Sequence, residues 1–77
     1  MANGIERPLD MLNHSKGKEV LLQLKNDKQV VGTLQAFDIH INVVLDNAKE
    51  LVNGEVKKSV GLIFVRGDTI IYISPAK

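Results

Sequence analysis

The stretch that decides the fold is GTLQAFDIHINVVL, residues 32–45. Apolar runs typical of β-strands lie at both of its ends, and Gly32 stands inside the first strand. A glycine inside a strand usually marks a sharp bend or the close approach of another backbone segment. Between the two runs, Asp38, His40 and Asn42 occupy alternate positions. We therefore expect two neighbouring strands, a bend in the first, and polar side chains where they meet.

The rest of the chain predicts one short helix and three more strands. Pro8 suits the first turn of a helix and Gly17 suits its end, so a helix is expected at about residues 8–14. Alternating apolar residues after Gly17 indicate strands over about residues 19–74. The expected strands cover residues 20–25 and 30–37, one that begins at Val43, and residues 60–65 and 69–73.

Turn signals separate these strands closely. Asn53-Gly54 is a strong hairpin signal, Gly67-Asp68 marks another tight turn, and Pro75 is expected to end pairing. Short turns between five strands favour an antiparallel sheet, and the bend at Gly32 favours a sheet that curls into a partly open barrel. The prediction is a single domain over residues 1–77. Its fold class is all-β with a short N-terminal helix, in a strongly bent, five-stranded antiparallel open barrel.

Composition narrows the possible functions. The chain has 77 residues and no cysteine, so disulfides and thiolate chemistry are excluded. Ten Lys and Arg against nine Asp and Glu give a net charge of +1, which argues against broad coating of a duplex or an anionic membrane. No run of about 18 apolar residues predicts a membrane helix. The polar segment Met1–Arg7 lacks a signal core, so we expect a cytoplasmic protein.

The last two strands are apolar on both faces, whereas an antiparallel strand with one wet face should alternate. In the fourth strand, Val60, Leu62 and Phe64 would lie on one face and Ile63 and Val65 on the other. In the fifth strand, Ile70 and Tyr72 would lie on one face and Ile71 and Ile73 on the other. A domain this small buries only about 60% of the surface of its unfolded chain and cannot easily cover both faces. We therefore expect another subunit to cover some of this surface, through edge-to-edge pairing that closes into a ring or grows into a filament.

Side chains able to hold a nucleobase lie beside two predicted bends. In an extended chain, side chains alternate between two sides. Asp38, His40 and Asn42 then share one side, and the residues between them, Ile39 and Ile41, face the core together with Val43. The turn after the fourth strand adds a guanidinium at Arg66. An imidazole for one face of a base, an amide for its edge and a guanidinium plane for the other face suit single-stranded nucleic acid.

Two motifs carry a family resemblance. Residues 32–45 resemble the first Sm motif, and IFVRGDTI, residues 63–70, resembles the second. The chain is similar to the Sm-like (Lsm) proteins of the archaeal type over nearly its whole length. The resemblance implies the Sm fold, an SH3-like barrel. It also implies a homo-oligomeric, usually heptameric ring in which the fourth strand of one subunit pairs with the fifth of its neighbour. The implied ligand is short, single-stranded U-rich RNA near a central pore.

The resemblance also assigns roles to individual residues. His40 matches the position that stacks on the base, and Asn42 matches the one that reads its edge. Arg66 matches the residue that covers the other face, and Gly67 matches a tight turn that the nucleotide can approach. The bacterial branch typically carries a Lys-His pair where this chain has Arg66-Gly67, which favours the Sm-like branch.

Asp38 and Asp68 match acidic positions of the two motifs, and we expect them to brace the site. The alternative for the whole chain is a ring that binds proteins, with RNA incidental. An enzyme is not expected, because no serine stands beside Asp38 and His40 as a nucleophile and phosphate-loop glycines are absent. Two distant histidines make no metal site, and no cofactor is implied. The expected role is a scaffold in RNA processing or turnover.

Overall fold

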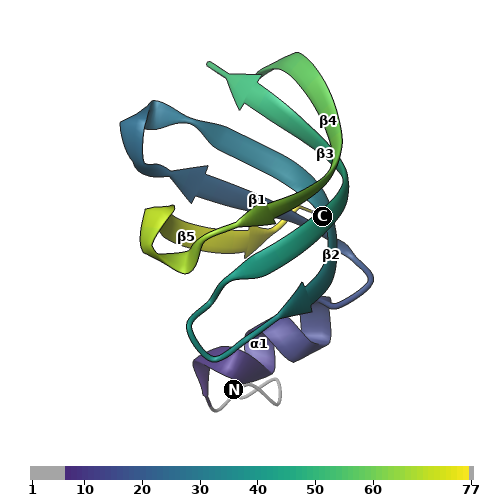
Figure 1. The fold of residues 1–77 in the computed structure, drawn as a ribbon, viewed down its shortest axis with the longest axis vertical. Coiled ribbons are helices and arrows are strands. Elements are labelled where there is room, and N and C mark those ends of the chain that lie inside the picture. The colour runs from purple at the N-terminus through teal and green to yellow at the C-terminus, as the bar shows by residue number, and fades with distance from the viewer. Residues whose placement is uncertain (1–6, 77) are drawn as a thin grey trace.

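The computed structural model describes residues 7–76, so the ends of the predicted domain, residues 1–6 and 77, lie outside the described residues. The polar N-terminal segment lies there too, apart from Arg7. The helix α1 spans Pro8–Ser15. The five strands are β1 (Glu19–Leu24), β2 (Gln29–Phe37), β3 (Val43–Val52), β4 (Glu55–Val65) and β5 (Ile70–Pro75). Short 3-10 turns, η1 at Lys25–Asp27 and η2 at Gly67–Thr69, lie between strands (Figure 1).

The predicted fold class is confirmed: one helix precedes five antiparallel strands in a bent sheet. The strand order is β4-β3-β2-β1-β5, so β4 and β5 form the two edges of the sheet. Among the described residues they do not pair with each other, which leaves the barrel open. The fully buried centre contains large aliphatic side chains from the three inner strands: Val20, Leu22, Leu34, Val43 and Leu45.

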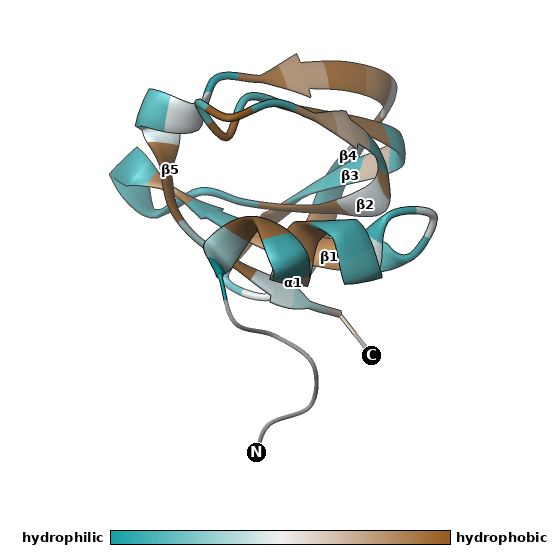
Figure 2. Ribbon diagram, turned by 90° about the horizontal axis from the view of Figure 1, so that it is seen from below, coloured by the Kyte–Doolittle hydropathy of each residue, from teal (hydrophilic) through white to brown (hydrophobic). Residues whose placement is uncertain are grey.

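The helix α1 closes one end of the bent sheet (Figures 1 and 2). Its first turn begins at Pro8, and the Asp10 carboxylate accepts a hydrogen bond from the Arg7 backbone at 3.1 Å. Leu12 is buried in the core, and Leu9, three residues before it in the helix, packs against the core as well. The chain then leaves the helix at Gly17, whose φ of 81° is the left-handed conformation that favours glycine.

Gly32 marks the predicted bend in β2. A Cβ atom there would lie 3.1 Å from both the Ala48 Cα and the Asp46 carbonyl oxygen. The pairing register between β2 and β3 shifts between Val31 and Thr33, on either side of this glycine. The two backbones approach so closely here that a side chain would push its neighbours away by a few tenths of an ångström, and the sheet turns at that point.

The structure corrects the bounds of two strands. The fourth begins at Glu55 and not at Val60, because the Asn53-Gly54 turn joins β3 directly to β4 and pairs Val52 with Glu55. Both turn residues have positive φ, which matches the twist of a two-residue hairpin. The fifth strand begins at Ile70, after the η2 turn.

The strand β5 ends at Pro75, where the sequence predicts a stop. This proline still lies opposite Val20, and the next residue, Ala76, donates its backbone N–H to the Glu19 carbonyl at 3.0 Å. The proline is thus the last paired residue of β5, and one backbone hydrogen bond follows it. A proline is tolerated there because β5 is an edge strand, and only one side of it must supply hydrogen bonds within the chain.

The predicted faces of the last two strands need a correction as well. In β4, Val60 packs against the core with Ile63 and not beside Leu62, because Gly61 inserts an extra residue with a φ of 73°. In β5, the pairing register shifts opposite Gln23 and Leu24, and this shift likewise changes which side chains face the core. Ile70 and Ile73 pack on the core, whereas Ile71 and Tyr72 are exposed.

Both edge strands nevertheless carry exposed apolar side chains, as expected. The large hydrophobic residues that are more than half exposed on these strands are Val56, Leu62, Phe64, Ile71 and Tyr72. Figure 2 shows the hydrophobic colouring along β5 and the end of β4. Within residues 7–76, no helix is both long and apolar enough to cross a membrane.

Candidate nucleic-acid interface

The register of the sheet brings two distant polar loops together. Val43, the first residue of β3, lies opposite Val65, the last residue of β4. The loop that precedes β3, residues 38–42, is therefore next to the turn that follows β4, residues 66–69. Each loop leaves the sheet at the same end, so their side chains meet although 25 positions separate Asn42 from Gly67.

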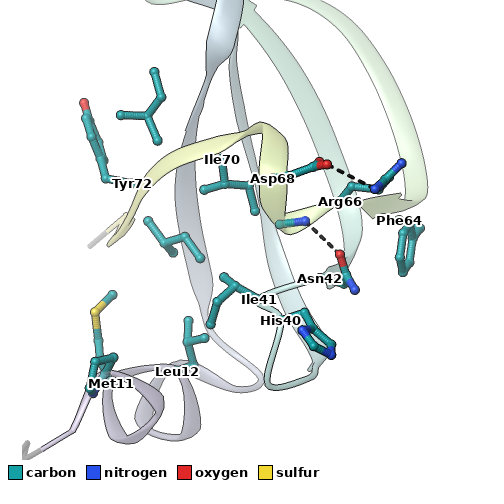
Figure 3. Close-up of a pocket in the computed structure, with 14 residues that line it drawn as sticks. Met11, Leu12, His40, Ile41, Asn42, Phe64, Arg66, Asp68, Ile70 and Tyr72 are labelled. Atoms are coloured by element: carbon teal, nitrogen blue, oxygen red, sulfur yellow. Dashed lines mark hydrogen bonds and ion pairs between the residues drawn. The ribbon is translucent and has the colours of Figure 1, made fainter.

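One hydrogen bond joins the loops directly. The Gly67 backbone N–H donates to the Asn42 Oδ1 atom at 2.8 Å (Figure 3). A Cβ atom on Gly67 would overlap the His40 carbonyl oxygen and lie 2.9 Å from the Ile41 carbonyl carbon. Gly67 is therefore required by the closeness of the loop at 38–42. Its missing side chain lets the two backbones touch.

Asp38 organises the first loop. Its Oδ1 atom accepts hydrogen bonds from the backbone N–H of His40 at 2.9 Å and of Asn42 at 3.2 Å. Its Oδ2 atom accepts from the Asn42 Nδ2 atom at 3.1 Å. This last bond is the main reason why the pKa of Asp38 is lowered, and the two backbone bonds act in the same direction. The carboxylate thus braces the turn in its ionised form.

The geometry of this loop overturns one sequence expectation. Residues 38–42 form a turn and not an extended segment, with Ile41 N–H donating to the Asp38 carbonyl at 3.0 Å and Ile41 at a φ of 63°. Alternation of side chains therefore fails here. Ile41 does pack against the core, but Ile39 is 75% exposed. An aspartate that accepts from its own loop two residues on is a known turn signal, and it was present in the sequence.

The second loop is a short turn stabilised by its own side chains. The Thr69 hydroxyl donates to the Arg66 carbonyl at 2.7 Å, which closes the turn η2. The Arg66 guanidinium donates to the Asp68 carboxylate at 3.0 Å, and both side chains are largely exposed. Asp68 therefore holds the Arg66 guanidinium, and the Arg66 side chain stays largely exposed to solvent.

The predicted site residues line one open groove of about 810 Å³. The predicted residues that line it are His40, Asn42, Arg66, Gly67 and Asp68. Asp38 does not line the groove, but its carboxylate accepts a hydrogen bond from the Asn42 side chain. In the view of Figure 3, Asn42 lies between Arg66 and His40. The two loops thus present an imidazole, a carboxamide and a guanidinium around the same space.

The sequence predicts apolar side chains on both edge strands, but it did not predict that three of them line this groove. Phe64, Tyr72 and Ile71, exposed on the edge strands, line it together with Met11 of the helix. Phe64 stands two residues before Arg66, and side chains two apart on a strand share a face, so this pairing was a readable signal. In the described part of the chain, no group of three His, Asp or Glu side chains could hold a metal ion.

Comparison with known proteins now adds to this geometry. Residues 10–75 match the family model of the LSM domain. The chain belongs to the LSM family. Among curated proteins it is 49% identical over 70 residues to an snRNP Sm-like protein of Archaeoglobus fulgidus, covering 91% of each chain. The archaeal Sm-like resemblance that the two motifs carry is thereby confirmed.

Solved structures of LSM proteins share this fold. The Sm protein of Pyrococcus abyssii, solved in complex with a uridine heptamer, has a TM-score of 0.89 and 46% identity; 92% of this chain and 100% of that one are covered. A heptameric archaeal Sm protein has a TM-score of 0.82 and 38% identity, with 88% and 98% covered.

Proposed function

We propose that this LSM protein is a ring-forming scaffold that binds short, single-stranded, U-rich RNA, one nucleotide to each subunit. The observation that carries the proposal is the hydrogen bond from Gly67 to Asn42, which holds two polar loops around one groove. The uridine heptamer bound to the Pyrococcus abyssii protein supports the choice of ligand. The role belongs to RNA processing or turnover in the cytoplasm, and it involves binding without catalysis.

The base is held by stacking and by its edge. His40 stacks on one face of the uracil and the Arg66 guanidinium covers the other, while Asn42 bonds to the edge between them. Base stacking of this kind contributes about 1–3 kcal/mol per base and does not depend on a high net charge. A nearly neutral chain can therefore bind RNA through repeated sites on one rigid scaffold, because each bound nucleotide raises the effective concentration of the next.

The ring follows from the two unlike edges of the sheet. The edge of β4 in one copy pairs with the edge of β5 in the next, which satisfies the unpaired backbone groups and covers Leu62, Phe64, Ile71 and Tyr72. Such a contact is heterologous, so it either closes into a ring or grows into a filament, and we propose the ring. The heptameric archaeal Sm protein supports a count of seven copies.

Binding of oligo-U tests the site. We expect His40→Ala, Asn42→Ala and Arg66→Ala each to weaken binding of a uridine heptamer by about 1–3 kcal/mol per base contacted. The control is Lys57→Ala, which removes an exposed charge on β4 away from the groove and should leave affinity nearly unchanged. Titration by fluorescence anisotropy measures all four. Unchanged affinity in all three site variants would refute the assignment.

A further inference from the structure

The proposed ring leaves part of one sheet edge without a partner. β4 has eleven residues and β5 has six, so a neighbour's β5 covers only the half of β4 that gains most from burial, from Val60 onwards with Leu62 and Phe64. The remaining segment, Glu55–Ser59, forms the free edge of β4, and each of its residues is exposed. As on any edge strand, the backbone N–H and C=O groups on its outer side face solvent and can pair with another strand.

The charges of the free edge oppose a second copy of this chain as that strand. Lys57 and Lys58 lie in the middle of the segment, and its single acidic residue, Glu55, lies at the end beside the Asn53-Gly54 turn. If the free edges of two copies paired in antiparallel fashion, their lysines would come together, and like charges opposite one another destabilise a sheet. The charge that complements this edge is therefore negative.

Both lysines are available to a partner's carboxylates. Among residues 7–76, the ion pairs lie at the start of α1 and in the turn η2, so none reaches the free edge. Even Glu50, which lies opposite Lys58 on β3, is not paired with it. An acidic strand placed beside β4 would therefore not have to displace an existing ion pair.

A bulge gives the two faces of the free edge different chemistry. Val56 lies opposite Leu51, and Lys58 lies opposite the neighbouring residue, Glu50, so Lys57 is an extra residue in β4. Directly opposite residues share a face and adjacent residues do not, which places Val56 and Lys58 on opposite faces of the sheet. The Val56 side chain is 57% exposed. A strand added here meets an apolar side chain on one face and an ammonium group on the other.

We propose that the free edge of β4 binds an extended, acidic segment of another protein as an added strand. Main-chain hydrogen bonds supply the affinity, and alternate side chains supply the specificity, apolar beside Val56 and acidic beside the lysines. The inference rests on the proposed ring, which covers the rest of β4, and it adds a protein partner to the proposed RNA ligand. Because the ring repeats this edge in every subunit, a partner with several such segments binds with raised avidity.

Three labelled peptides test the proposal on the assembled protein. The first is a hexapeptide of alternating glutamate and valine, and the second has lysine in place of each glutamate. The third has the sequence of the first with every backbone nitrogen methylated, so it keeps the charge but donates no main-chain hydrogen bond. In anisotropy titrations we expect the first peptide to bind at least about tenfold more tightly than either of the others.

Two double variants locate the site. Lys57→Glu with Lys58→Glu should reverse the preference between the glutamate and lysine peptides. If that protein does not assemble, Lys57→Gln with Lys58→Gln replaces it and should abolish the preference. The matched control, Lys25→Glu with Lys28→Glu, makes the same change of charge at two exposed lysines in and just after η1, and it should keep the wild-type preference. The two glutamate variants have equal net charge and should bind a uridine heptamer alike.

The outcomes separate this inference from the proposed function. Rings that bind the uridine heptamer but bind the glutamate and lysine peptides equally, or bind neither, refute the peptide site alone. Equal binding of the methylated peptide refutes strand addition, and a preference reversed equally by the control variant places the contact elsewhere and refutes this site. A wild type that native mass spectrometry shows to be monomeric refutes the ring and this inference with it, because all of β4 would then be open.

Discussion

Among single residues, Gly67 has the least freedom to change. Its missing side chain faces the carbonyl oxygen of His40 and the backbone of Ile41, and these atoms cannot yield as a flexible side chain would. Gly67→Ala should therefore destabilise the fold by about 1–3 kcal/mol and separate the two loops. Chemical denaturation measures the first effect and oligo-U titration measures the second.

Gly17→Ala is the control for that change. Gly17 has a φ of 81° but open space around it, so alanine there costs only backbone strain of roughly 1–2 kcal/mol. It lies at the end of α1 and should not change RNA affinity. If the two variants lose affinity to the same extent, the contact between the loops is not what Gly67 provides.

The ionisation of Asp38 makes stability depend on pH in a defined direction. Its pKa in the folded protein is lowered from the usual 3.8, chiefly by the Asn42 side chain. The contribution is therefore fully present above that usual value and is lost as pH falls through the lower folded pKa. Denaturation midpoints from about pH 6 to about pH 2 should show the wild type losing its advantage over Asp38→Asn in this acid range. A constant difference would contradict the linkage.

The sequence indicated which residues would meet but not how each one points. Val43 and Val65 begin and end predicted strands, so the approach of Asn42 to Arg66 followed from strand order and short turns. The outward position of Ile39 did not follow, because an extended chain was assumed across residues 38–42. That assumption fails when a side chain such as Asp38 satisfies the backbone N–H groups of a turn, an effect that hydrophobic alternation does not register.

At the scale of the elements, the bend in β2 is the feature on which the open barrel depends. Gly32→Ala would force a Cβ against the backbone of β3 at Asp46 and Ala48, with distances of 3.1 Å before relaxation. We expect a loss of about 1–3 kcal/mol in the free energy of unfolding, measured by denaturant titration. Gln35→Ala, at an exposed position on the same strand, should change it by less than about 0.5 kcal/mol. Equal effects would show that the close approach is unimportant.

The sequence of strands along the chain and the bend could be predicted because turn residues and an interior glycine are local signals, whereas the pairing of β5 with β1 could not. The lengths of the strands and the side chains that face the core could not be predicted. The half of β4 from Glu55 to Ser59 is exposed and polar, so it lacks the apolar alternation by which strands are recognised. The β-bulge at Gly61 adds one residue to β4, so the side chains before it switch to the opposite face of the sheet. This extra residue becomes visible only from the pairing with β3 at Ala48.

For the whole molecule, assembly should depend on the apolar half of β4 and on β5. β5 has six residues and β4 has eleven, so a neighbour's β5 can cover only part of β4. Phe64→Glu and Tyr72→Glu would each bury a charge in that contact, and we expect native mass spectrometry to detect monomers. Val56→Glu is the control: it alters an exposed apolar residue of β4 in the polar half and should leave the ring intact.

The open sheet order has a further consequence for mixtures of copies. Because β4 and β5 are different edges, a copy with a damaged β4 can still attach to a sound partner through β5, but nothing can follow it. Closed circles have no such terminus. If a minority of Phe64→Glu subunits is added during refolding, each one should therefore stop an incomplete ring from growing. Closed rings would then be lost in a larger proportion than the fraction of variant subunits. With a symmetric two-fold contact, only the dimers that contain a variant subunit would be lost.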